Sequence, residues 1–305
     1  MLGFCPEGRN KNEEKRSYTA EKLYEAASSG EILEATAYMC DTEHNLLVNL
    51  GGMKGVIPRL EGAVGIAEGI TRDIALISRV GKQVCFTVEE IKTDGYNRPY
   101  ALLSRRRAQQ KCRNEFINGL TSGDIIDARI THLESFGAFC DIGCGNIALL
   151  PIDSVSVSRI SHPADRFSTG DDIKVIVKSV DEDGRITLSH KELLGTWQEN
   201  ADRISAGDTV SGIVRSVESY GIFVELAPNL AGLAEPKDGV RVGQTASVYI
   251  KSIIPEKMKV KLIIIDSFDE TPPKSYDYFY EGDRIERFLY SPPNSSKYIE
   301  TVFGL

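Results

Sequence analysis

The sequence predicts an all-β protein of three tandem five-stranded barrels, joined by short helical linkers and flanked by N- and C-terminal extensions. The main observation is an internal repeat. A Gly-Asp, an alternating strand, the motif Glu-Ser-aromatic-Gly and a second alternating strand occur at residues 123–143 and again at 207–226. A short apolar stretch and two further strand-like segments follow each copy, and five short strands in so few residues are typical of a small closed barrel.

The first elements in chain order are an extension and a degenerate barrel. Residues 1–29 form the extension and contain a helix for which Thr19 is the expected N-cap. Residues 30–107 repeat the order of the later barrel elements with few identical residues, so we expect a barrel there too. Helix-like composition predicts a linker helix at residues 108–120, and the basic run at 105–107 is expected to be a solvated helix face.

The two clear copies of the repeat follow. The middle barrel is expected at residues 121–191, where Asp-Gly within Asp181–Gly184 supplies a tight hairpin turn between the last two strands. A second linker helix at residues 192–204 leads to the last barrel at 205–266. The OB-fold is the commonest nucleic-acid-binding barrel of this kind. Residues 267–305 are too irregular for a fourth barrel, so we expect a partly ordered tail.

The composition excludes several classes of protein. Lys and Arg total 36 against 44 Asp and Glu, a net charge of −8, so nucleic-acid binding would depend on local sites rather than on a generally basic surface. No apolar run approaches the roughly 18 residues of a membrane helix, and the six cysteines show no disulfide framework. We therefore expect a cytoplasmic protein with no membrane contact.

The sequence also lacks a constellation typical of catalysis. Its four histidines are scattered, and Cys140 and Cys144 have no second pair of ligands nearby to complete a zinc site. The glycines near Gly62 lack the Lys-Ser/Thr of a phosphate loop. We expect a protein that is not an enzyme, with no catalytic residues, no metal and no cofactor.

Strand alternation places aromatic side chains on the outside of two barrels. In the middle copy Cys140 points into the barrel, which leaves Phe139 and Asp141 outside, and the last copy repeats this pattern with Phe223 and Glu225. Each outward Phe follows another aromatic residue by three positions. Such rings could stack on the bases of single-stranded nucleic acid, or they could pack against a linker helix. The candidate stacking residues are Phe136, Phe139, Tyr220 and Phe223.

Basic residues lie beside these aromatics. Arg185 and Lys259 begin the last strand of their barrels, where a cation can pair with a phosphate while a ring holds the base. The alternative is an ordinary solvated charge. Four further residues on neighbouring strands are weaker candidates for the same basic patch: Arg129, Lys174, Lys178 and Arg215.

Residues 30–266 resemble the S1 RNA-binding domain family, an OB-type module that occurs in tandem in the bacterial small ribosomal subunit. The resemblance is carried by ESFGAFCDIG and SVDEDGRITLSHKEL in the middle copy and by ESYGIFVEL in the last. It implies an RNA face made of two aromatics, a histidine on the third strand, and an Asp and a basic residue flanking the last hairpin. The matching positions in the middle copy are Phe136, Phe139, Pro151, Asp181 and Arg185.

In the last copy the resemblance points to Tyr220, Phe223, Glu235, Pro255 and Lys259. Pro151 and Glu235 depart from the histidine of the family, so each barrel lacks one expected contact. The first copy retains little stacking surface, and the expected order of RNA affinity is middle, last, first.

These observations predict a protein that binds single-stranded RNA, including mRNA, and acts in translation or its regulation at the ribosome. The expected partners are single-stranded RNA and the ribosome or ribosomal proteins. The alternative is a scaffold that docks on the ribosome or on an RNA-processing enzyme and has largely lost RNA binding. The net acidity and the departures at Pro151 and Glu235 favour this alternative.

Overall fold

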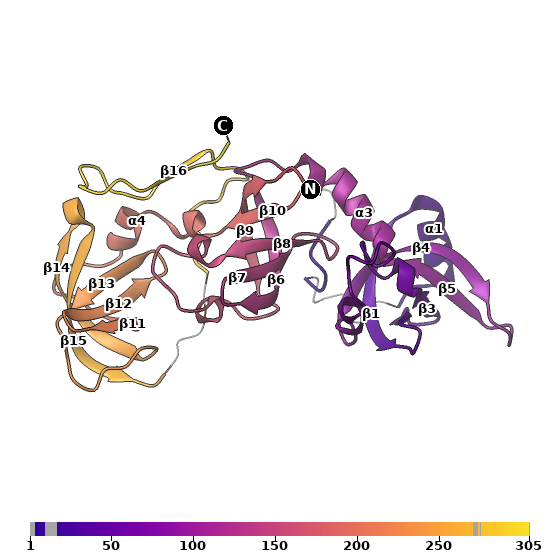
Figure 1. Ribbon diagram of the computed structural model, residues 1–305, viewed down its shortest axis with the longest axis horizontal. Coiled ribbons are helices and arrows are strands. Elements are labelled where there is room, and N and C mark those ends of the chain that lie inside the picture. Colours follow the sequence, from indigo (N-terminus) through magenta and orange to yellow (C-terminus); the bar gives the residue numbers. More distant parts are fainter. Residues whose placement is uncertain (1–3, 10–16, 271–273, 275, 305) are drawn as a thin grey trace. The chain divides into compact units, whose positions relative to one another are not determined.

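The computed structural model describes residues 4–9, 17–270, 274 and 276–304. It contains three closed five-stranded barrels and a two-stranded sheet, which confirms the predicted all-β fold (Figure 1). We number the barrels 1, 2 and 3 in chain order. Residues 1–120, 127–129 and 141–147 form one compact unit, unit 1, and the remaining residues form unit 2.

Barrel 1 has the strand order β1-β2-β3-β5-β4 and closes through a parallel pairing of β3 with β5. Two helices, α1 (Ala20–Ser29) and α3 (Arg105–Glu115), pack against β4. Thr19 caps α1 by accepting the N–H of Lys22, and α2 (Ile74–Ile77) lies between β3 and β4. The strands are β1 (Ile32–Cys40), β2 (Leu46–Asn49), β3 (Lys54–Ile57), β4 (Gln83–Thr93) and β5 (Pro99–Ser104).

Barrels 2 and 3 repeat this topology, with parallel closure of β8 against β10 and of β13 against β15. Cys140 is buried inside barrel 2, as strand alternation predicts. The strands of barrel 2 are β6 (Ile125–Glu134), β7 (Gly137–Asp141), β8 (Ile147–Pro151), β9 (Asp172–Val180) and β10 (Ile186–Ser189). Those of barrel 3 are β11 (Thr209–Glu218), β12 (Gly221–Ala227), β13 (Leu230–Ala234), β14 (Thr245–Ile254) and β15 (Lys259–Phe268).

The connection between barrels 2 and 3 is helical but short. A 3₁₀ helix at Lys191–Leu194 is followed by α4 (Trp197–Ala201). A capping box formed by Thr196 and Glu199 starts α4, and Trp197 is buried in the core of unit 2. The linker therefore contributes apolar surface to the core as well as joining the barrels.

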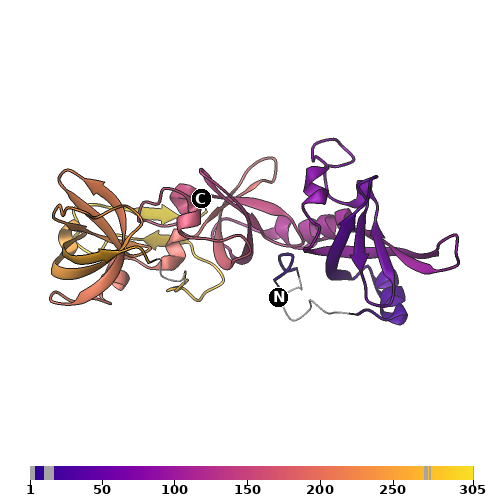
Figure 2. The same ribbon diagram turned by 90° about the horizontal axis from the view of Figure 1, so that it is seen from below.

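The C-terminal segment belongs to unit 2 and contains two short strands. Strands β16 (Arg287–Leu289) and β17 (Glu300–Val302) form a hairpin at the junction of barrels 2 and 3 (Figures 1 and 2). Phe288 and Tyr290 lie in the core of unit 2, and the Tyr290 hydroxyl donates to the carbonyl of Asn229 at 2.6 Å. Residues 271–273, 275 and 305 of the predicted tail, like 1–3 and 10–16 of the N-terminal extension, lie outside the described residues.

Within unit 2, an ion pair joins barrel 2 to barrel 3. The guanidinium of Arg166, in the β8–β9 connection, donates to both carboxylate oxygens of Glu225 on β12, at 2.8 and 3.0 Å. Arg215 on β11 binds the same carboxylate at 2.9 and 3.2 Å. Burial opposes ionisation of Glu225, but the hydrogen bonds and charges of the two arginines hold its pKa below the usual range. Glu225 does lie outside the barrel, as predicted, but it is buried at the contact with barrel 2.

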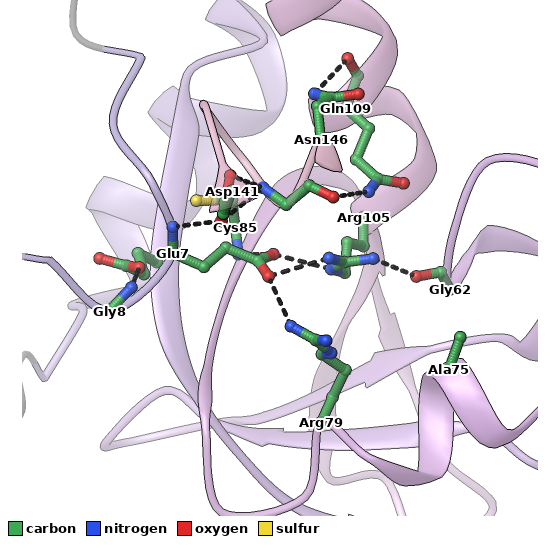
Figure 3. A network of polar contacts seen from close by, with 12 residues as sticks. Glu7, Gly8, Gly62, Ala75, Arg79, Cys85, Arg105, Gln109, Asp141 and Asn146 are labelled. Atoms are coloured by element: carbon green, nitrogen blue, oxygen red, sulfur yellow. Dashed lines mark hydrogen bonds and ion pairs between the residues drawn. The ribbon is translucent and has the colours of Figure 1, made fainter. Parts of the chain in front are cut away.

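Glu7 lies at the centre of a buried polar network in unit 1 (Figure 3). Its carboxylate accepts two hydrogen bonds from Arg105, at 2.7 and 2.8 Å, and forms an ion pair with Arg79 at 3.4 Å. Its backbone N–H donates to Asp141, whose carboxylate also accepts the N–H of Gly145. Burial opposes ionisation of Glu7, but Arg105 holds its pKa below the usual range. The expected solvated face is therefore wrong for Arg105, because its guanidinium is buried against Glu7.

Candidate nucleic-acid interface

The turn between β6 and β7 of barrel 2 presents two aromatic rings. Phe136 is 55% exposed and Phe139 is half-buried, and their ring centroids lie 6.0 Å apart with the planes at 90°. Gly137, the first residue of β7, allows β8 to lie close, because a Cβ at that position would approach the carbonyl oxygen of Leu150 to 2.6 Å. The exposed ring of Phe136 and the edge-on ring of Phe139 together leave apolar surface open to a ligand.

Barrel 3 repeats this arrangement at the turn between β11 and β12. Tyr220 is 66% exposed, and its ring lies 6.2 Å from that of Phe223 at an interplanar angle of 85°. Gly221 has the same role at the start of β12, since a Cβ there would lie 2.7 Å from the carbonyl oxygen of Ala234 on β13. The exposure of Phe136 and Tyr220 favours a surface platform over packing against a linker helix.

A third ring, which the sequence analysis did not identify, adjoins the pair in barrel 2. His132 on β6 lies 6.3 Å from Phe139 with the ring planes at 26°, and its side chain is 64% exposed. In barrel 3 a β-bulge between Val214 and Ser216 places Ser216 opposite Phe223, and Ser216 has the position in the repeat that His132 has in barrel 2. A bulge shifts the alternation of side chains, so strict alternation along β11 misplaces Ser216. The same alternation along β6 places His132 inside the barrel, although its side chain is exposed.

The hairpin after β9 carries the other two predicted residues of barrel 2. The Asp181 carboxylate accepts the backbone N–H of Arg185 at 2.7 Å, so it has a structural role in the turn. The side chain of Arg185 is 79% exposed and lies 3.6 Å from the carboxylate of Asp183. In barrel 3, Lys259 is exposed at the start of β15, directly after the turn residue Met258.

Two of the four weaker candidates have side-chain partners within the protein. The guanidinium of Arg215 is bound to Glu225, and the ammonium of Lys178 donates to the hydroxyl of Ser154 at 3.0 Å. Lys174 is exposed, and its backbone N–H donates to the Tyr278 hydroxyl of the C-terminal segment. Arg129 is half-buried and belongs to unit 1. The charged groups of Arg215 and Lys178 are therefore held by other side chains, while Lys174 and Arg129 stay predictions.

Two positions depart from the family pattern in the structure as in the sequence. Pro151 ends β8, and Glu235 follows β13 as an exposed carboxylate 3.6 Å from the ammonium of Lys251. Across the described residues, His, Cys, Asp and Glu side chains do not come together in threes as a metal site would need. The helices in the described part of the chain are too short or too polar to span a membrane.

The barrel topology and the repeated aromatic turn define a protein built from tandem OB-type domains. Residues 120–191, which include all of barrel 2, match the S1 RNA binding domain family. The class is therefore that of S1-domain proteins.

The chain belongs to the family of the bacterial small ribosomal subunit protein bS1. It is 30% identical over 310 residues to bS1 of Staphylococcus epidermidis, an alignment that covers 96% of this chain and 74% of that protein. It is 31% identical over 269 residues to bS1 of Staphylococcus aureus strain COL, covering 83% of this chain and 65% of the relative's length.

Among solved structures, one similar chain is the multidomain protein with nucleic acid binding domains from Streptococcus pneumoniae. It covers 81% of this chain and 75% of its own, at 16% identity and a TM-score of 0.25.

Proposed function

We propose that this protein binds single-stranded RNA, including mRNA, through the aromatic turns of barrels 2 and 3. The observation that carries the proposal is the repeated pair of edge-on rings, Phe136 with Phe139 and Tyr220 with Phe223. Aromatic rings exposed on an OB-type barrel hold unstacked bases, and each stacked base contributes about 1–3 kcal/mol with little sequence preference. Such rings need single strands, because the bases of a duplex are already stacked.

The family membership supports a role on the ribosome, in translation or its regulation. The relatives from both Staphylococcus species are named as small ribosomal subunit proteins. We infer a cytoplasmic protein that contacts RNA and ribosomal proteins and is not an enzyme. Two aromatic sites in one compact unit would also bind one strand more tightly than either site alone, because the second contact becomes intramolecular.

A scaffold function is the second candidate, and the acidic surface of barrel 2 favours it. The turn Asp181–Asp183 carries three exposed carboxylates beside Arg185, and the chain has a net charge of −8. Such charges repel phosphates, so a barrel with this turn could serve protein contacts instead.

Fluorescence anisotropy of a labelled RNA tests the two candidates. An unstructured RNA of about 20 nucleotides would cover two OB-type sites, and it should be titrated with the full chain at two salt concentrations beside a duplex of equal length. We expect saturable binding that favours the single strand and weakens with salt. Equal affinity for the duplex, or no binding at low salt, would favour the scaffold.

A further inference from the structure

One row of outward residues crosses all five strands of barrel 3. The register pairs Ser216 with Phe223, Phe223 with Leu233, and Leu233 with Lys261, and Lys261 also pairs with Ser252. Paired residues of neighbouring strands point to the same face of a sheet. With strands about 4.8 Å apart, Lys261 begins about 10 Å from Phe223, and its four-carbon stem can bring the ammonium closer.

The corresponding row of barrel 2 has different side chains at its two ends. One constant offset along the repeat places His132, Phe139 and Leu149 at the positions of Ser216, Phe223 and Leu233, in that order. Thr187 has the position of Lys261 because it pairs with Leu149 as Lys261 pairs with Leu233. Barrel 2 therefore has an extra ring at the start of its row and no cation at the end, whereas barrel 3 has a cation at the end and no extra ring.

The turns beside the two rows differ in charge in the same direction. In barrel 2 the turn Asp181–Arg185 has three carboxylates and one arginine, all exposed. In barrel 3 the turn Pro255–Lys259 has one glutamate and two lysines, and these three side chains are exposed too. A phosphate near barrel 3 therefore meets a net positive site formed with Lys261, while a phosphate near barrel 2 meets a net negative one.

We propose that the two barrels divide RNA binding between them. Barrel 2 holds bases by stacking on His132, Phe136 and Phe139, and barrel 3 supplies most of the contact with the phosphate backbone through Lys257, Lys259 and Lys261. This inference rests on the proposed RNA binding and assigns its two physical components to different barrels. Stacking is insensitive to salt, whereas each phosphate contact adds to the salt dependence of the affinity.

Exchanging the end side chains of the rows between barrels 2 and 3 tests this division of RNA binding. The affinity for the single-stranded RNA is measured in full-length variants at several salt concentrations, and the slope of log K against log salt is determined. For single strands this slope is negative, and each lost phosphate contact makes it less steep by about 0.7. We expect Lys259→Gln with Lys261→Thr to make the slope less steep by about 1.4, and Thr187→Lys to make it steeper by about 0.7.

Exchanging the side chains of His132 and Ser216 should change the affinity for RNA and leave its salt slope unchanged. We expect His132→Ser to weaken binding about fivefold, the lower end of what one stacked base contributes, and Ser216→His to strengthen it. The matched control is Lys54→Gln with Lys82→Gln, which removes two exposed lysines of barrel 1 and should keep the wild-type slope.

The outcomes separate this inference from the proposed function. If the wild type binds RNA but the Lys259 and Lys261 variant and the control have the same slope, the division is wrong and the RNA binding stands. The proposed division of RNA binding is also overturned if His132→Ser makes the salt slope less steep while the affinity at high salt is unchanged. If the wild type does not bind RNA at all, the proposed function itself fails.

Discussion

Arg166 and Glu225 form a buried bidentate ion pair across the junction of barrels 2 and 3, with N–O distances of 2.8 and 3.0 Å. Glu225 lies two residues after Phe223 on the same face of β12, so the contact between the barrels begins where the aromatic turn of barrel 3 ends. The docking of the two barrels and the candidate RNA surface therefore share one strand.

Glu225→Gln should destabilise unit 2 strongly. The substitution leaves Arg166 and Arg215 buried without their carboxylate, and removing one partner of a buried pair costs about 3–5 kcal/mol. Urea unfolding followed by Trp197 fluorescence, from the core of unit 2, measures the change. Arg166→Met should cost less, because Glu225 keeps Arg215. Equal free energies of unfolding for Glu225→Gln and the wild type would show that the pair does not hold the barrels together.

The stability of unit 2 should fall as the pH falls from about 6.5 toward 4 because of His190. Its Nδ1 lies 3.1 Å from the carbonyl oxygen of Val155, which can only accept, so the neutral ring donates there. Burial lowers the pKa of His190 to about 4, whereas a histidine in the unfolded chain has a pKa of about 6.5. Between these two values the unfolded state takes up a proton that the folded state excludes, so the unfolding free energy decreases with falling pH.

Unfolding experiments at pH 7.5 and pH 5 check this dependence. His190→Asn retains a donor for Val155 and cannot be protonated, so it should lose about 2 kcal/mol less than the wild type between the two pH values. A His190→Asn variant with the full wild-type pH dependence would exclude His190 as its cause.

Glu7→Ala should destabilise unit 1, although Glu7 lies outside the barrels. The change leaves the buried guanidinium of Arg105 without its carboxylate partner, again at a cost of about 3–5 kcal/mol. Glu25→Ala is a suitable control, since Glu25 is an exposed carboxylate of the same unit. Thermal unfolding of both variants gives the comparison. Indistinguishable melting temperatures would contradict a stabilising role for the network.

The fold was predictable from the sequence because its signals are local. The Glu-Ser-aromatic-Gly motif and the alternation that buries Cys140 repeat at a constant spacing, and these fix strands and turns without knowledge of their neighbours. The aromatic turns at Phe136 and Tyr220 could be located for the same reason. The segment after Phe268 has no such period. Its buried aromatic residues Phe288, Tyr290 and Phe303 are positioned by contacts with the core of unit 2, which the local sequence does not reveal.

The parts of the site that sequence reasoning missed depend on contacts between strands and domains. In barrel 3 a bulge turns Ser216, the residue that matches His132, outward. Strict alternation places this position inside the barrel. Arg215 was predicted to be a candidate for binding RNA because Glu225 was expected to be exposed to solvent. In the structure Arg166 of barrel 2 and Arg215 both bind the Glu225 carboxylate. Lys261 required the parallel pairing of β13 with β15 before its alignment with Phe223 could be recognised.

The affinity of a Phe136→Ala, Phe139→Ala variant for unstructured single-stranded RNA tests the central claim most directly. The control is Tyr24→Ala with Tyr96→Ala, which removes two exposed rings of unit 1 that lie outside the proposed site. Loss of two stacked bases predicts binding weaker by about 2–6 kcal/mol for the Phe136 and Phe139 variant, with the control at the wild-type value. Unchanged affinity in a folded Phe136 and Phe139 variant would contradict base stacking on barrel 2.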